Sequence, residues 1–213
     1  MKALIAMMAA CVVFAAGPAA RVDDPLEPIP AELIEKVGKR LIDETAKFDK
    51  PQVKIEAELS KAYGLHKPGE AGMLVVPQKD LKESEELAAK FKSEKGAPLA
   101  ILFTYRLTPV VDGKVADDSR VREIKFIDDE GAARPVQALL LSVRQIGDDY
   151  RLYAWGYEDK PLVDAKFSQT DSGGSEPVGL SVKDLDEGTR QGTLVVTVFG
   201  KYQASIRMQH KAE

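Results

Sequence analysis

Residues 136–157 have the sequence VQALLLSVRQIGDDYRLYAWGY, and this stretch decides the class of fold. Apolar side chains dominate residues 136–146 and recur through residues 150–157. Gly147-Asp148-Asp149 separates the two runs, and a short glycine-containing connection between two such runs predicts a β-hairpin. The stretch therefore predicts two neighbouring antiparallel strands.

Shorter strand patterns lie on both sides of this hairpin. Residues 101–107 alternate between the two faces of a strand, which we expect to end at Pro109. Residues 169–176, with Ser172-Gly173-Gly174-Ser175, predict a flexible loop. Short connections cannot provide parallel crossovers, so we expect mainly antiparallel pairing. The remaining strands are predicted at residues 121–127, 162–167, 178–182, 193–199 and 202–208.

The N-terminal half predicts two helices. Pro30 suits the first turn of a helix that reaches about Phe48, with an apolar stripe along one face. Asp80 and Glu83 have the spacing of a capping box and predict a second helix, which ends before Gly96. Both helices precede most of the strands.

A second hairpin is expected between these helices. Residues 53–60 alternate apolar and polar side chains and predict a strand. The turn at residues 66–70 would join it to a short strand at residues 73–76. The latter strand, the capped helix and the strand from residue 99 also have the order of a local βαβ unit. The overall prediction is one α+β domain over residues 31–213, with a mainly antiparallel sheet or sandwich.

The first twenty residues have the organisation of a cleavable signal peptide. Lys2 is their only charge, residues 3–16 are all apolar, and Gly17-Pro18 ends the run. The run is shorter than the roughly 20 apolar residues that span a bilayer. We expect residues 1–20 to be removed and residues 21–30, which contain three prolines, to form an extended leader.

Cys11 is the only cysteine and lies inside the apolar run. Met8-Ala9-Ala10-Cys11 superficially resembles a lipidation signal, but further apolar residues follow it, so lipid anchoring is the less favoured alternative. Cleavage leaves a domain without a disulfide or a thiol nucleophile. We expect an exported protein, periplasmic or extracellular, with no transmembrane segment in the mature chain, and we assume a monomer.

The charges are interspersed and nearly balanced. The chain has 30 Lys and Arg against 34 Asp and Glu, which gives a net charge of -4. Sequence-independent binding to phosphate depends on clustered Lys and Arg. Nucleic acid is therefore a disfavoured partner.

No residue pattern matches a common catalytic, metal-binding or nucleotide-binding motif. His66 falls in a predicted turn and His210 lies near the C-terminus, so neither has the context of a catalytic imidazole. The acidic clusters also fall in predicted turns. Residues 184–187 resemble the start of a calcium loop, but Thr189 stands where an EF-hand requires glycine. We expect no catalytic residues, metal or cofactor.

Tyr153, Trp155 and Tyr157 form the one candidate binding surface. In a strand their side chains project from the same face. An exposed aromatic strip would bind sugar rings or peptides, whereas a buried strip would belong to the core. The core interpretation is favoured, and the strip is the weaker hypothesis.

Three functions are compatible with these patterns. The leading hypothesis is an exported, non-catalytic module that binds a protein, a polysaccharide or a small ligand. One alternative is a carboxylate-dependent hydrolase of envelope or extracellular polymers, which needs two facing carboxylates. The other is a carrier of an apolar ligand, which needs an enclosed apolar cavity of some hundreds of cubic ångströms.

Overall fold

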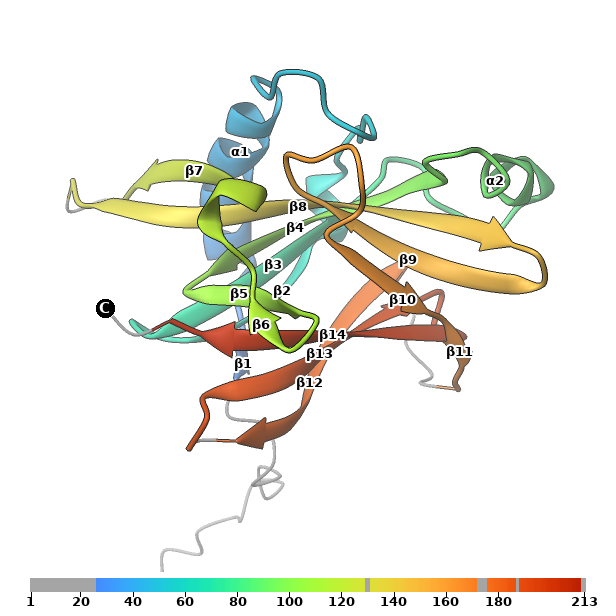
Figure 1. The fold of residues 1–213 in the computed structure, drawn as a ribbon. Helices are drawn as coiled ribbons and strands as arrows, with labels where there is room; N and C mark the ends of the chain where they lie inside the picture. The colour runs from blue at the N-terminus through green and yellow to red at the C-terminus, as the bar shows by residue number, and fades with distance from the viewer. Residues whose placement is uncertain (1–25, 129–130, 172–175, 187, 212–213) are drawn as a thin grey trace, which may run out of the picture.

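A computed structural model describes residues 26–128, 131–171, 176–186 and 188–211. The expected signal peptide lies outside these ranges, and its cleavage stays a prediction. Within them the fold is mostly antiparallel β-sheet with two helices, which confirms the predicted β-rich class (Figure 1). Neither helix in the described ranges is long and apolar enough to cross a membrane.

Two sheets form the body of the fold. The first has eight strands: β1 (Glu27–Pro28), β2 (Tyr63–Lys67), β3 (Ala71–Pro77), β4 (Ala97–Tyr105), β7 (Arg122–Ile127), β8 (Ala133–Ile146), β9 (Asp149–Trp155) and β10 (Val163–Lys166). The second has six: β5 (Leu107–Val111), β6 (Lys114–Val115), β11 (Ser168–Gln169), β12 (Val178–Asp186), β13 (Gln191–Val198) and β14 (Tyr202–His210). Their orders are β1-β2-β3-β4-β8-β9-β10, with β7 also on β8, and β12-β13-β14-β5-β6, with β11 on β14.

The predicted hairpin at residues 136–157 is confirmed as β8 and β9. Leu139 and Leu141 of β8 belong to a core that contains residues of both sheets. Ala138 and Leu140 point the other way, into a core that the first sheet shares with helix α1 (Ala31–Thr45). Because β8 is buried on both faces, successive apolar residues are needed, and this explains its unbroken apolar run.

The chain bends from one sheet to the other at Arg106. This residue has a positive φ of 57° and separates β4 from β5. The single strand that we expected over residues 101–107 is therefore two strands in different sheets. Pro109 does not end the pairing, because it lies within β5, opposite Met208 of β14.

The first predicted helix is confirmed as α1, whereas the start of the second was wrong. Helix α2 (Glu85–Lys90) begins after Ser84, whose hydroxyl accepts a hydrogen bond from the backbone N–H of Leu87 at 3.2 Å. Asp80 lies before the helix at a φ of 56°. Its backbone N–H donates to the Glu58 carboxylate at 3.2 Å, so this segment is held by a neighbouring loop instead.

The strand predicted at residues 53–60 was also wrong. Only Ala57 makes a bridge, to Gln78, and a short 3-10 helix follows at Leu59–Lys61. The partner of β3 is β2, which includes His66, so the turn is shorter than expected. The βαβ alternative fails as well, because β3 and β4 pair antiparallel.

The end of the expected leader is part of the fold. Strand β1 pairs with β2, and Ile29 donates a backbone hydrogen bond to Gly64 at 2.9 Å. Leu26 also packs against the core between the sheets. Residues 26–29 are therefore packed against the domain, and Pro28 lies in an edge strand, where proline is tolerated.

Candidate functional site

The aromatic strip does not present three rings on one surface. Tyr153 and Trp155 are 5% and 2% exposed, and their rings meet edge to face with centroids 5.5 Å apart. The indole Nε1–H donates to the Ser142 hydroxyl at 2.8 Å. Two of the three residues therefore belong to the core beneath α1, while ligand binding by the set stays a prediction.

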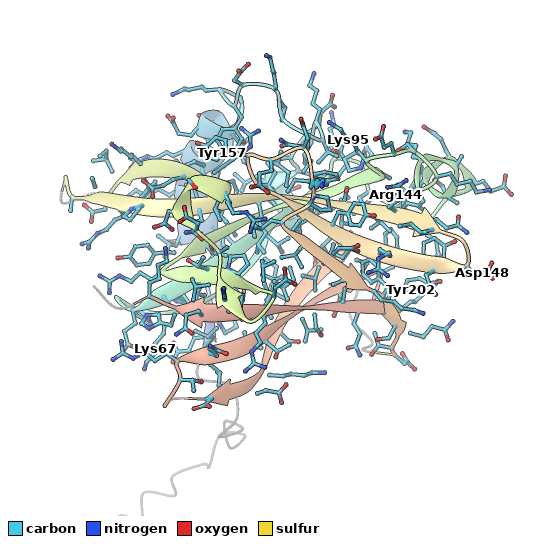
Figure 2. The ribbon with its side chains drawn as sticks, viewed as in Figure 1. Lys67, Lys95, Arg144, Asp148, Tyr157 and Tyr202 are labelled. Carbon is cyan, nitrogen blue, oxygen red and sulfur yellow. The ribbon has the colours of Figure 1, made fainter. Side chains whose placement is uncertain are left out.

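Tyr157 departs from the strip because β9 ends before it. A side chain at Gly156 would overlap the Arg120 carbonyl oxygen, since a Cβ there would lie 1.9 Å from it. The backbone N–H of Tyr157 donates to the same oxygen at 3.0 Å. Tyr157 is 53% exposed, and the centroid of its ring lies 4.9 Å from the guanidinium carbon of the buried Arg122. Figure 2 shows Tyr157 on the loop beyond β9, apart from Tyr202.

The ionisable residues considered as candidates, His66, His210 and Asp186, all lie in strands. His66 is in strand β2, and the ring of His210 contacts the Glu70 carbonyl at 3.3 Å. Asp186 accepts backbone hydrogen bonds from Thr189 and, with a smaller effect, from Gly188, and these hold its pKa below the ordinary value. No group of three or more His, Cys, Asp or Glu residues in the described ranges has a metal-binding arrangement.

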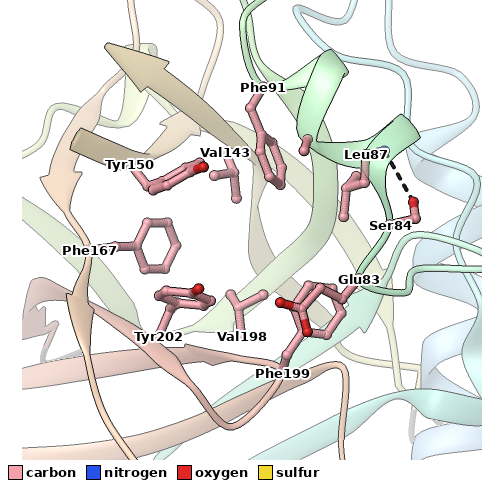
Figure 3. Close-up of a pocket in the computed structure, with 11 residues that line it drawn as sticks. Glu83, Ser84, Leu87, Phe91, Val143, Tyr150, Phe167, Val198, Phe199 and Tyr202 are labelled. Atoms are coloured by element: carbon pink, nitrogen blue, oxygen red, sulfur yellow. Dashed lines mark hydrogen bonds between the residues drawn. The ribbon is translucent and has the colours of Figure 1, made fainter. Parts of the chain in front are cut away.

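A different set of aromatic residues lines a pocket between the two sheets, which we call the aromatic pocket (Figure 3). Its volume is about 140 Å³. The walls come from α2 and the segment before it, the β8–β9 hairpin, the link between β10 and β11, and the β13–β14 turn. The lining residues are Glu83, Ser84, Leu87, Ala88, Phe91, Val143, Tyr150, Phe167, Val198, Phe199 and Tyr202.

Three aromatic rings of this pocket contact one another. Phe91 meets Tyr150 edge to face, with centroids 5.6 Å apart, and Tyr150 lies 6.4 Å from Tyr202. Backbone hydrogen bonds fix two of the walls: Gln145 donates to the Phe91 carbonyl at 2.8 Å, and Phe167 donates to the Tyr150 carbonyl at 2.9 Å. These ring contacts and hydrogen bonds hold the pocket walls in place. Both the faces and the edges of the aromatic rings are available to a ligand.

Phe199 occupies an unfavourable backbone conformation at the pocket wall. It and Gly200 form the turn between β13 and β14, with φ angles of 53° and 65°. Glycine, asparagine or aspartate is usual at the first position of such a turn, and a bulky residue there is an outlier. Strain of this kind costs about 1–3 kcal/mol and is concentrated at functional sites. In this position Phe199 supplies an aromatic ring to the pocket wall.

One ion pair connects two walls of the pocket. Lys201, next in the turn, donates from Nζ to the Glu83 carboxylate at 2.6 Å, and both side chains are more than half exposed. The hydrogen bond that Lys201 donates to the Glu83 carboxylate raises the pKa of Lys201. The pair adds little stability in water, but it orients the segment before α2 relative to the β13–β14 turn.

The lining is chemically suited to binding an apolar group. Its charged member is Glu83, which is already paired with Lys201, and its other polar side chains are the hydroxyls of Ser84, Tyr150 and Tyr202. Ser84 is engaged as the cap of α2. The remaining surface consists of hydrocarbon and ring carbon, so contact area and ring geometry determine what fits.

Comparison with models of protein families, with curated proteins and with solved structures found no match for this chain.

Proposed function

We propose that this protein is an exported binding module that holds one ring-sized apolar group in the aromatic pocket. The observation that carries the proposal is the convergence of five aromatic rings, from segments far apart in the chain, around a small open pocket. Small-molecule sites are typically concave and lined mainly by apolar and aromatic side chains with a few polar groups. The unfavourable backbone of Phe199 supports the same conclusion, because a smaller residue would suit the turn better.

The size of the pocket defines the ligand class. An engineered cavity of about 150 Å³ in another protein binds benzene, whereas sites for whole drug-sized ligands measure roughly 300–1,000 Å³. With about 140 Å³, the aromatic pocket fits a single aromatic ring. This favours a binding module over the carrier alternative, because an extended acyl chain needs more volume. The ring would belong to a small molecule or to an aromatic side chain of a partner protein.

The test is a titration of the mature protein with p-cresol, followed by NMR amide shifts. We expect saturable shifts at residues of the aromatic pocket and an affinity in the millimolar range or tighter, as befits so few ligand atoms. N-acetyl-tyrosinamide, added separately, tests whether a peptide-linked ring enters as well. Decanoate tests the carrier: if it binds far more tightly than p-cresol at the same residues, the ring-sized site is wrong.

Phe199→Gly separates a binding role from a structural one. Glycine relieves the positive φ but removes a ring that packs against the core between the sheets, so these two effects of similar size oppose each other and stability should change by no more than about 2 kcal/mol. Affinity for p-cresol should nevertheless fall several-fold, because one wall of the pocket is removed. Tyr157→Ser is the matched control, since it removes an exposed ring outside the pocket and should leave affinity unchanged. Equal affinity of Phe199→Gly and the wild type would contradict the proposal.

A further inference from the structure

Strand β7 forms an edge of the first sheet. Its inner side pairs with residues 133–138 of β8, and no described strand pairs with its outer side. Figure 1 shows β7 at the margin of the fold, where α1 packs on one face of the strand. At the end of the strand, the Ile127 carbonyl accepts a hydrogen bond from Arg40 of α1 at 3.3 Å. The unpaired N–H and C=O groups of such an edge are a template for pairing with a strand of another chain.

The direction of the backbone groups follows from a hydrogen bond at the end of β7. Asp128 donates its N–H toward β8, to the Ala132 carbonyl at 2.9 Å, so the preceding carbonyl, that of Ile127, points outward. Successive residues of a strand present their backbone groups to opposite sides, so those of Glu123 and Lys125 point outward as well. These are the groups that an added strand would bind.

The side chains of these two residues carry opposite charges. Glu123 and Lys125 are both exposed, and they project from the same face of β7 because residues two apart in a strand share a face. Ile124, between them, points the other way and is buried in the core beneath α1. Neither charge has an ion-pair partner in the part of the chain that the structure describes. Charges on an edge oppose pairing with an apolar or like-charged strand, so a partner strand needs the complementary order of charges.

The β7 strand of a second copy has this complementary order. In an antiparallel register centred on Ile124, Glu123 lies opposite Lys125 of the second copy, and Lys125 lies opposite Glu123 of the second copy. The outward backbone groups of the same residues then face each other, and each such pair exchanges two hydrogen bonds. Registers centred on Glu123 or on Lys125 would place like charges opposite each other, which is destabilising. The charges therefore select one register.

We propose that β7 is a dimerisation edge, at which two copies of this chain join their first sheets around Ile124. The backbone hydrogen bonds supply the attraction and the ion pairs select the register, because exposed ion pairs add little affinity. β7 has six residues, and an interface of this size is at the weak end of specific contacts. We therefore expect a dissociation constant on the order of 100 µM. The edge adjoins the start of β8, away from the aromatic pocket, so the proposal does not depend on ligand binding there.

The experiment is sedimentation velocity and NMR of the mature protein over a concentration series from roughly 10 µM to 1 mM. We expect an equilibrium between monomer and dimer, with concentration-dependent amide shifts that are largest at residues 122–127. The amide protons of Glu123 and Lys125 should exchange more slowly with solvent at high concentration, because the second copy accepts their hydrogen bonds. A monomer at every concentration, or a dimer whose shifts lie elsewhere, would overturn the proposal.

Charge exchange at the two exposed positions tests the register without risk to the fold. Glu123→Lys places positive charges opposite each other, and Lys125→Glu places negative charges opposite each other, so each variant alone should dimerise about tenfold more weakly. In an equimolar mixture every pair is again of opposite sign, so a heterodimer should form. The double variant should dimerise like the wild type, for the same reason.

Glu94→Lys is the matched control, because it makes the same change of charge at an exposed position between α2 and β4. It should leave dimerisation unchanged, and all variants should keep the melting temperature of the wild type to within a few degrees. Undiminished dimerisation of both single variants, or a mixture that forms no heterodimer, would contradict the pairing of β7 strands.

Discussion

The inner face of β8 ends in two unlike environments. Val143 borders the aromatic pocket, and Gln137 borders a second cavity of about 270 Å³, about 20 Å away at the usual rise of a strand. Leu139 and Leu141 lie between them, fully buried. The first cavity is lined mainly by aromatic and aliphatic side chains, and the second mainly by charged and polar side chains, among them Arg134, Asp118 and Lys211. One pair of sheets therefore encloses two cavities whose linings differ in polarity.

The difference predicts how each end responds to solvent. Salt does not weaken apolar contact, whereas it screens interactions between exposed charges that lie more than about 8 Å apart at physiological ionic strength. Binding in the aromatic pocket should therefore persist at high salt, while the charged lining at the other end is the part of the gap that salt affects. The leucines between the ends keep the two cavities apart.

Leu139→Ala should have the largest effect on stability. The side chain is completely buried between the two sheets, and truncation of such a leucine costs about 2–5 kcal/mol through lost transfer energy and a residual cavity. Urea unfolding followed by Trp155 fluorescence would measure the loss. If the variant lost less than about 1 kcal/mol, the leucines would not form the packed separation between the two cavities.

Ser84→Ala should have an intermediate effect that is confined to the aromatic end. The hydroxyl caps α2, and loss of a side-chain N-cap costs about 1 kcal/mol. Because Leu87 lies in α2 and Phe91 directly follows it, affinity for p-cresol should fall. Asp80→Ala, at the position first predicted as the cap, provides the comparison: it should leave p-cresol binding intact. The opposite ranking of the two variants would place the helix start at Asp80.

Lys201→Gln should have the smallest effect on stability. The pH dependence of this effect shows whether the ion pair with Glu83 causes it. Glu83 raises the pKa of Lys201, so the contribution of the pair is complete below the ordinary value of 10.5 and is lost as the pH rises through the raised pKa. Wild type and variant should therefore differ slightly in urea midpoint at pH 8 and converge as the pH rises through that raised pKa. Lys47→Gln, which removes an exposed ion pair to Glu44 just beyond the end of α1, is the control for loss of a surface lysine. A constant difference at every pH would exclude this ion pair as its cause.

The strands that the sequence predicted well are those whose pattern follows from burial. The runs around β8, β9, β13 and β14 are long, and turn residues separate them, so local chemistry was enough. The segment at residues 53–60 has the alternation of a strand but no room in the sheet, because β2 occupies the place beside β3. Its outcome was decided by competition for a pairing edge, which a local pattern does not contain.

The aromatic pocket was missed for a related reason. Its walls extend from Glu83 to Tyr202 along the chain, and nothing local brings them together. The strip at Tyr153 and Trp155 had a regular period, yet the intervening Leu152 and Ala154 are fully buried as well, which identifies a strand covered on both faces. One local signal was available: Phe199 precedes Gly200 in a short turn between two strands, where an aromatic residue is unusual.

The most direct test of the central claim is the measurement of intermolecular NOEs between p-cresol and the protein. The account predicts contacts from the p-cresol methyl and ring protons to the methyl groups of Leu87, Val143 and Val198 and to the rings of Phe199 and Tyr202. These contacts should persist in high salt and be weaker in Phe199→Gly at the same p-cresol concentration. Contacts to Tyr157 alone, or no intermolecular contacts at saturating p-cresol, would contradict the aromatic pocket as the binding site.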